Sequence, residues 1–316
     1  YQCEQTAGGK GCTKIGICSK TPEIAAMQDL LIYQLKGISL YAKELLDRNE
    51  NLDDSIAAFV EDGLFMTLTN VNFDPVAHMS MLKKSQQIKE DLRKKAGGSN
   101  ITSEYALYNL SSSKEEILED AKKAGIMYDE NLNPDIRSVR ETIKYGLKGI
   151  AAYSHQARFI KYTSEEVNNF YFKGLASLTD DNLSLEDLIK VLIETGDISV
   201  KIMELLDTAN NTVYNSPTPT KVNVNIKKGP FIVISGHDLR DLQMLLEQTE
   251  GKGINIYTHG EMLPSHGYPE LNKYAHLAGN FGSAWQNQQK EFDNIPGCIL
   301  MTTNCLMKPK DSYIDR

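Results

Sequence analysis

Cysteine is absent from most of this chain. The 316 residues include five cysteines, and none lies between Cys18 and Cys298. Cys3, Cys12 and Cys18 stand close together at one end, whereas Cys298 and Cys305 lie near the other. A dense group of thiols in a chain otherwise so poor in cysteine indicates a metal centre.

Two further absences limit the class of protein. No apolar run approaches the ~20 residues that span a membrane, and the first residues do not form a charged region followed by an apolar one, as a signal peptide does. The net charge of −8 also argues against nucleic acid as the main partner. We therefore expect a cytoplasmic protein that binds neither nucleic acid nor membrane. In that compartment clustered thiols more often bind metal than form disulfides.

The chain is rich in helical patterns between residues 22 and about 215. Thr21 is suited to cap the first helix, and Pro22 fits its first position. Apolar residues then recur at helical spacing, which predicts a helix over 22–48. Further helices are expected over 55–70 and 75–95, the last of which stops at Gly97-Gly98.

The first helical pattern is repeated later in the chain. Residues 28–45 (QDLLIYQLKGISLYAKEL) resemble residues 140–157 (RETIKYGLKGIAAYSHQA). Each copy places a glycine, Gly37 or Gly149, inside an apolar helical stripe, where it costs about 1 kcal/mol relative to alanine. We expect close helix packing at both glycines. The pattern predicts two antiparallel helical bundles, at about 22–98 and 135–210, related by an internal repeat.

The proline-containing segment 215–220 marks a change in the pattern. Short β-branched runs alternate with helical ones beyond it, which predicts a parallel, Rossmann-like α/β sheet. The expected strands are 221–226, 230–235, 254–259 and 298–303, and the expected helices are 238–251 and 283–294. The predicted fold class is multidomain α and α/β. Its parts are a cysteine-cluster loop (1–20), an all-α domain of two repeated helical bundles (21–216) and an incomplete α/β domain (217–316).

Residues that can bind metal follow three of these strands. His237 follows one strand, His259 and Glu261 close the next, and Cys305 follows the last. Ligands bind outside the carboxyl ends of such strands, so these side chains should approach one crevice. Nitrogen, oxygen and sulfur donors together suit iron or zinc better than magnesium or calcium. Each residue alone also has an ordinary structural explanation, and His266 could line the same crevice or merely support it.

The cysteine loop at the N-terminus carries Gly8, Gly9 and Gly11, which let backbone N–H groups approach sulfur closely. Its glycines do not have the spacing of a phosphate-binding loop. A structural zinc site is the alternative to an iron–sulfur cluster, but such a site normally takes four protein ligands and no histidine lies nearby.

Long motifs along the whole chain resemble the hybrid cluster protein family, also called the prismane or hydroxylamine reductase family, which is related to the carbon monoxide dehydrogenases. The motifs that carry the resemblance are YQCEQTAGGKGCTKIGICSK, TLTNVNFD, PTPTKVNVN, ISGHDL, LLEQTEG, YTHGEMLPSHGYPEL, GSAWQNQQKEF and MTTNC.

The resemblance implies two metal centres. Cys3, Cys12 and Cys18 match three of the four cysteines that hold an N-terminal cluster, in the shorter spacing of the [4Fe–4S] members rather than the longer spacing of the [2Fe–2S] members. The remaining cysteine would precede Tyr1. His237, Glu261 and Cys305 match the histidine, the first glutamate and the first cysteine ligands of a hybrid [4Fe–2O–2S] cluster. His259 and His266 are then neighbours that support the ligands.

The family has further hybrid-cluster ligands, namely cysteines, a glutamate and a lysine, beyond the part that this chain matches. The resemblance therefore implies an N-terminal fragment that lacks part of both ligand sets and is inactive alone.

The activity implied for the parent protein is reduction of hydroxylamine to ammonia and water, with electrons from a ferredoxin-like or flavin-containing donor. Nitric oxide reduction in nitrosative-stress defence is an alternative. A redox-sensing or protein-nitrosylating protein would use the same cluster without turnover, and a zinc-stabilised interaction module would contain no iron.

Overall fold

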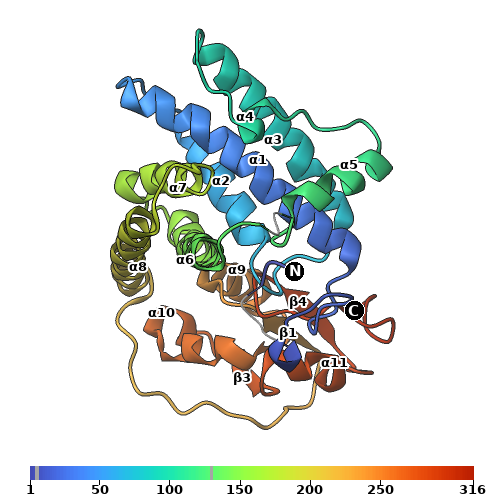
Figure 1. Ribbon diagram of the computed structural model, residues 1–316. Helices are drawn as coiled ribbons and strands as arrows, with labels where there is room; N and C mark the ends of the chain where they lie inside the picture. The colour runs from blue at the N-terminus through green and yellow to red at the C-terminus, as the bar shows by residue number, and fades with distance from the viewer. Residues whose placement is uncertain (4–6, 129–130) are drawn as a thin grey trace. The chain divides into compact units, whose positions relative to one another are not determined.

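A computed structural model describes residues 1–3, 7–128 and 131–316 (Figure 1). Residues 4–6 of the predicted cysteine-cluster loop lie outside the described residues. The elements, in chain order, are η1 (Ala7–Gly9), α1 (Pro22–Asp47), α2 (Asp54–Met66), α3 (Pro75–Lys95), α4 (Glu104–Leu107), α5 (Lys114–Asp120), η2 (Ala121–Ala124), α6 (Pro134–Phe159), α7 (Glu165–Ser177), α8 (Leu185–Tyr214), β1 (Phe231–Ser235), α9 (Leu239–Thr249), β2 (Asn255–His259), η3 (Gly260–Gly267), α10 (Pro269–Asn272), β3 (Leu277–Phe281), η4 (Trp285–Asn287), α11 (Gln288–Glu291) and β4 (Cys298–Met301).

The chain divides into two compact units. The helical unit comprises residues 1–68, 72–155 and 163–204, and the α/β unit comprises 69–71, 156–162 and 205–316. The predicted fold class, α followed by parallel α/β, is confirmed. The domain limits given from the sequence stay a prediction. No helix in the described ranges is both long enough and apolar enough to cross a membrane.

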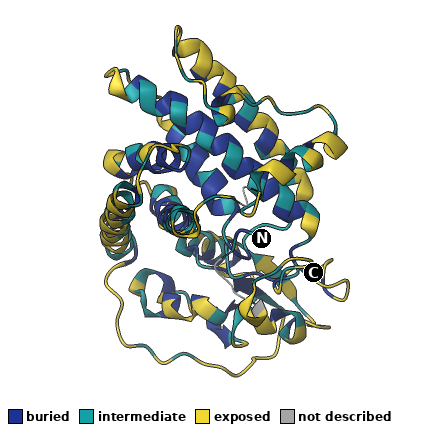
Figure 2. Cartoon of the chain, viewed as in Figure 1, coloured by how far each residue is buried: buried dark blue, intermediate teal, exposed yellow. Residues whose placement is uncertain are grey.

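The helices predicted at the start of the helical unit are present. α1 begins at Pro22, and the Thr21 hydroxyl accepts a hydrogen bond from the Ile24 N–H at 3.3 Å. Asp53 and Asp74 cap α2 and α3 in the same way. Buried side chains gather where these helices face one another, and α3 turns much of its charged segment to solvent (Figure 2).

The repeat predicted from the sequence is visible in the packing of its two copies. Gly63 of α2 faces Leu35 of α1, and a methyl group added at Gly63 would lie 2.9 Å from a Leu35 methyl carbon. Gly174 of α7 faces Leu147 of α6, and the corresponding distance is also 2.9 Å. In each copy, therefore, the leucine of the Leu-Lys-Gly tripeptide packs against a glycine of the following long helix.

The prediction of close packing at the tripeptide glycines is right for one and wrong for the other. A methyl group at Gly37 would lie 2.2 Å from the backbone oxygen of Tyr105, because α4 lies against α1 at that point. A methyl group at Gly149 would meet nothing within 4 Å. The second glycine is therefore not required by helix packing.

The α/β unit contains a four-stranded parallel sheet in the order β3-β2-β1-β4. Both sides of the sheet are covered by apolar side chains. One cluster joins Ile234 and Ile256 to Leu242 and Leu246 of α9. The other joins Val233 and Tyr257 to residues around Phe292. Because β1, β2 and β4 are neighbours, their carboxyl ends lie at one edge of the sheet.

Three details differ from the sequence prediction. Residues 221–226 form no strand; their side chains are largely exposed, and Asn223 contributes one backbone hydrogen bond, accepted from Asn280 of β3. β3 itself was not predicted, because Leu277–Phe281 has no β-branched residue. The helix expected over 283–294 is present only as the short η4 and α11.

Candidate metal centre

The loop after β1 brings His237 against the loop after β4. Gly236 has φ 141°, and a methyl group there would lie 2.0 Å from the Thr302 hydroxyl oxygen. Only glycine permits this approach of the two loops. The backbone N–H of His237 then donates a hydrogen bond to the Thr303 hydroxyl at 2.9 Å.

The loop after β4 is held by Gln288, a residue that the sequence analysis did not identify. Its buried side-chain amide donates to the backbone oxygen of Cys305 at 2.7 Å and to the Ser235 hydroxyl at 3.0 Å. Its amide oxygen accepts from the N–H of Met307 at 2.9 Å. Gln288 therefore fixes the backbone on either side of Leu306, while Cys305 adopts a left-handed conformation with φ 61°.

His237, Glu261 and Cys305 meet at the carboxyl ends of the three neighbouring strands. Oε2 of Glu261 lies 2.9 Å from Nε2 of His237 and 3.0 Å from Sγ of Cys305. Glu261 stands in the first turn of η3, directly after β2, and its side chain is 54% exposed. Each of the three residues offers one donor atom, and the three atoms lie within 4.8 Å of one another.

The orientation of His237 suits a metal ligand. Its Nδ1 lies 3.3 Å from the backbone oxygen of Asn304, so Nδ1–H is the donor in that contact and Nε2 faces Glu261 and Cys305. Metal-binding histidines commonly donate their second ring N–H to a carbonyl or carboxylate in this way. The donor set of imidazole, carboxylate and thiol thus fits a borderline transition metal such as iron.

The surroundings of the Cys305 thiol disfavour the thiolate unless a cation lies beside it. The pKa of the thiol is raised to about 12, mainly by burial and also by the hydrogen bond to the Glu261 carboxylate and the charge of that carboxylate. Without a cation the site holds the thiol protonated. A bound metal ion reverses this preference, because a coordinating thiol loses its proton.

The two other histidines of this region lie behind the metal-binding edge. Nδ1 of the buried His259 is 3.0 Å from the Ser235 hydroxyl, and its Nε2 is 2.9 Å from the Glu291 carboxylate. Burial lowers the pKa of His259. His266 is also buried, and its Nε2 lies 2.9 Å from the Thr258 hydroxyl. Among the described hydrogen bonds, neither reaches the three candidate ligands directly, although His259 shares Ser235 with Gln288.

The N-terminal cysteines lie in the helical unit. Cys18 is buried, and burial raises the pKa of its thiol, which a hydrogen bond from the backbone of Lys20 opposes. The Sγ of Cys12 accepts a hydrogen bond from the Ile17 N–H at 3.4 Å. Gly8, Gly9 and Gly11 have positive φ, from 61° to 79°, with nothing within 4 Å of an added methyl group. Their role here is therefore conformational.

A further cluster in the helical unit pairs His155 with two acids. Nδ1 of His155 lies 2.9 Å from Oδ1 of Asp62 and 3.8 Å from Oε1 of the buried Glu61. Both carboxylates approach the same ring nitrogen, as expected for an interaction of a histidine with acids. We therefore do not assign a metal to this cluster.

A parallel α/β sheet with imidazole, carboxylate and thiol at one edge, preceded by a helical repeat and a cysteine loop, defines a class of multidomain metalloproteins. Residues 1–316 match the Prismane/CO dehydrogenase family, and the chain belongs to this family. Membership of the family implies iron–sulfur clusters.

Similar proteins are named hydroxylamine reductase. The chain is 47% identical over 317 residues to one from Syntrophobacter fumaroxidans and 47% identical over 325 residues to one from Desulfitobacterium hafniense (strain Y51). It is 44% identical over 347 residues to one from Clostridium tetani. These alignments cover 99–100% of this chain but 58–60% of each relative. The chain therefore spans somewhat more than half the length of the curated relatives that it matches.

Proposed function

We propose that the full-length protein is an iron–sulfur oxidoreductase that reduces hydroxylamine, taking up two electrons and two protons and releasing ammonia and water. The observation that carries this proposal is the meeting of His237, Glu261 and Cys305 at the edge of the sheet. The printed names of the relatives support the reaction. Electrons would come from a ferredoxin-like or flavin-containing partner in the cytoplasm.

We assign the two cluster sites as follows. His237, Glu261 and Cys305 would contribute three ligands to the hybrid cluster, and Cys3, Cys12 and Cys18 would contribute three to a [4Fe–4S] cluster that passes electrons on. When bound, the hybrid cluster supplies electrons and an iron position open to a small nitrogen compound.

The protein's own contribution at the hybrid site is to position the ligands. Thr303 and Asn304 orient His237 through its backbone N–H and its Nδ1, and Gln288 orients the Cys305 backbone. His259 and His266 support the sheet edge from behind. The exposed Glu261 carboxylate would complete this part of the site, because its Oε2 lies 2.9 Å from Nε2 of His237 and accepts a hydrogen bond from the Cys305 thiol at 3.0 Å.

The substitution Glu261→Gln in the full-length protein tests this function. We expect loss of hydroxylamine turnover by at least a hundredfold, because the amide is a poor iron ligand and cannot carry the negative charge. Steady-state turnover and EPR spectra should be measured under anaerobic conditions. The matched control is Glu247→Gln on α9, which removes an acid of the same unit that is hydrogen-bonded to Gln243. Unchanged turnover and spectra in Glu261→Gln would contradict the assignment.

Nitric oxide reduction in nitrosative-stress defence is a second candidate, since the same open iron position would accept nitric oxide. The ratio of kcat/KM for the two compounds distinguishes the candidates. A redox-sensing or protein-nitrosylating role would instead give a stoichiometric reaction followed by transfer to a thiol, without repeated turnover.

A further inference from the structure

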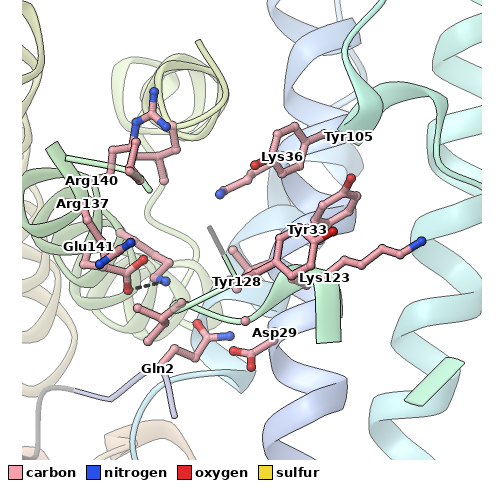
Figure 3. A pocket seen from close by; sticks show the side chains of 17 residues that line it. Gln2, Asp29, Tyr33, Lys36, Tyr105, Lys123, Tyr128, Arg137, Arg140 and Glu141 are labelled. Atoms are coloured by element: carbon pink, nitrogen blue, oxygen red, sulfur yellow. Dashed lines mark ion pairs between the residues drawn. The ribbon is translucent and has the colours of Figure 1, made fainter. Parts of the chain in front are cut away.

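The helical unit contains a polar cavity that the proposed reaction does not use (Figure 3). Its volume is about 110 Å³, and its walls come from α1, α4, η2 and α6 together with the segments that follow η2 and α7. Among the described residues that line it, the cationic side chains outnumber the acidic ones by five to two. The cationic residues are Lys36, Lys123, Arg137, Arg140 and Lys144.

The two acids of the lining are already engaged. Glu141 lies 2.5 Å from the ammonium group of Lys144, one turn further along α6. Asp29 is hydrogen-bonded to the side chain of Gln2 and interacts electrostatically with Lys144 and Lys148. Burial raises the pKa of Asp29 to about 6, and these cations oppose the rise. Neither acid is therefore available to neutralise a further cation in the cavity.

Lys36, unlike Lys144 and Arg140, forms no ion pair with an acid among the residues that the structure describes. Figure 3 shows its side chain extending from α1 toward the side chains of α6. Its described contact is with the ring of Tyr105, whose centroid lies 4.9 Å from Nζ. Arg140, by contrast, donates to the backbone oxygen of Asp180 and to the Asp181 carboxylate, at 2.8 and 3.0 Å.

The electrostatic surroundings of Lys36 also favour an added negative charge. Burial lowers its pKa to about 7, and repulsion by Lys144 adds to the decrease. Glu141 and Asp181 oppose the decrease, whereas Arg140 reinforces it. An anion beside the ammonium group would reduce the free-energy cost of keeping Lys36 charged in these surroundings. A half-buried cation without an ion pair is costly, and proteins usually satisfy one with an opposite charge.

We propose that this cavity is a binding site for a small inorganic oxyanion, held by the ammonium group of Lys36 and by the cationic side chains of α6. The volume has room for roughly three or four water-sized groups at ~30 Å³ each, which is the scale of a tetrahedral oxyanion. Charge-assisted hydrogen bonds from lysine and arginine are the usual means by which proteins hold such groups.

The affinity should depend on pH with a defined sign. The anion prefers the ammonium form of Lys36, so binding is strongest below the free-state pKa of about 7 and weakens as the pH rises above it. Sulfate keeps its charge throughout this range, so the dependence reports on the protein. Protonation of Asp29 below about pH 6 should strengthen binding further. Arg140 keeps its charge throughout the range.

The test is calorimetric titration of the full-length protein with sodium sulfate at pH 6.5, at constant ionic strength set by chloride. Lys36→Met should weaken binding at least tenfold, the size expected for a charge-assisted hydrogen bond. The control is Lys43→Met, which removes a lysine of the same helix that is exposed and paired with Asp47. It should bind as the unsubstituted protein does. Equal binding by all three proteins, or no saturation at millimolar sulfate, would overturn the proposal.

A second measurement needs no substitution and therefore does not depend on how a variant folds. Titrations at pH 7.5 in two buffers of different ionisation enthalpy give the number of protons exchanged. Uptake of a substantial fraction of one proton per sulfate is expected, because binding returns Lys36 to its charged form. Zero uptake would overturn the role of Lys36.

Discussion

The two copies of the helical repeat share the tripeptide Leu-Lys-Gly but use only its first residue in the same way. Leu35 and Leu147 each pack against a glycine of the next helix, at the same distance. The lysines and glycines that follow them have different surroundings. The comparison teaches that the two copies keep the leucine–glycine contact between their helices. The lysine and glycine positions that follow each leucine differ because the segments packed against the two copies differ.

The lysines show the difference most clearly. Lys148 is 2% exposed, and its ammonium group donates to the side-chain oxygen of Gln2 at 2.6 Å and to the backbone oxygen of Thr67 at 3.2 Å. It therefore connects the second copy to the residue before Cys3. Lys36 makes no comparable bond among the described residues and faces the cavity instead.

The largest effect in this comparison is expected from Gly37→Ala. The added methyl group would lie 2.2 Å from a backbone oxygen, so α1 and α4 must move apart. We expect a loss of about 2–3 kcal/mol in the free energy of unfolding, in the upper part of the range for overpacked cores. Thermal unfolding followed by circular dichroism measures it. A variant as stable as the unsubstituted protein would show that α4 yields without cost.

Exchanging the lysines for methionine should separate their roles. Lys148→Met leaves two buried acceptors without their donor, and we expect a loss of about 1–2 kcal/mol. Lys36→Met removes no hydrogen bond to any residue that the structure describes, and it should stabilise the protein by about 1 kcal/mol at pH 6, a value reduced for partial exposure.

The stabilisation by Lys36→Met should also depend on pH. The folded-state pKa of about 7 is below the unfolded value, near 10.4, so the folded state holds fewer protons between these limits. The energetic cost of the charge is complete below pH 7 and declines as the pH rises toward 10.4. Melting temperatures of both proteins between pH 6 and 9 should therefore converge. A constant difference would argue against titration of Lys36.

The smallest effect should come from Gly149→Ala, and its sign should be opposite to that of Gly37→Ala. The added methyl group meets nothing within 4 Å, so the intrinsic helix preference of alanine decides the outcome. We expect a gain of up to about 1 kcal/mol. Destabilisation would mean that the two glycines are equivalent after all, as the sequence alone had suggested.

Much of the fold follows from local sequence signals. Thr21 and Pro22 begin α1 where predicted, and the β-branched runs of β1 and β2 are strands. Residues 221–226 have a similar pattern but no buried face, so they remain outside the sheet. β3 lacks β-branched residues, but it pairs with β2 and its Leu277, Ala278 and Phe281 join the apolar clusters of the sheet. The sequence of a segment alone does not determine whether the segment pairs with a strand of the sheet.

The candidate site was predictable in part for the same reason. His237, Glu261 and Cys305 follow strands, and parallel strands end at one edge, so their meeting could be expected. Gln288 lies 53 residues from Ser235 and 17 from Cys305, and only the folded chain brings their polar groups together. The amide-rich segment 286–289 was the sole indication of its role. Gly149 shows the converse, because a repeated residue need not keep a repeated function.

The contact of the two loops at Gly236 has a mechanical consequence for the metal centre. The backbone N–H of His237 donates to the Thr303 hydroxyl, and Gln288 links the Cys305 backbone to Ser235 of β1, so both of these candidate ligands are anchored to a neighbouring part of the sheet edge. Glu261 is half exposed, and in the described part of the chain its contacts are the hydrogen bond from the Cys305 thiol and the approach of Nε2 of His237. With a metal bound, Glu261 would be the ligand that can move, while His237 and Cys305 would stay fixed by the hydrogen bonds around them.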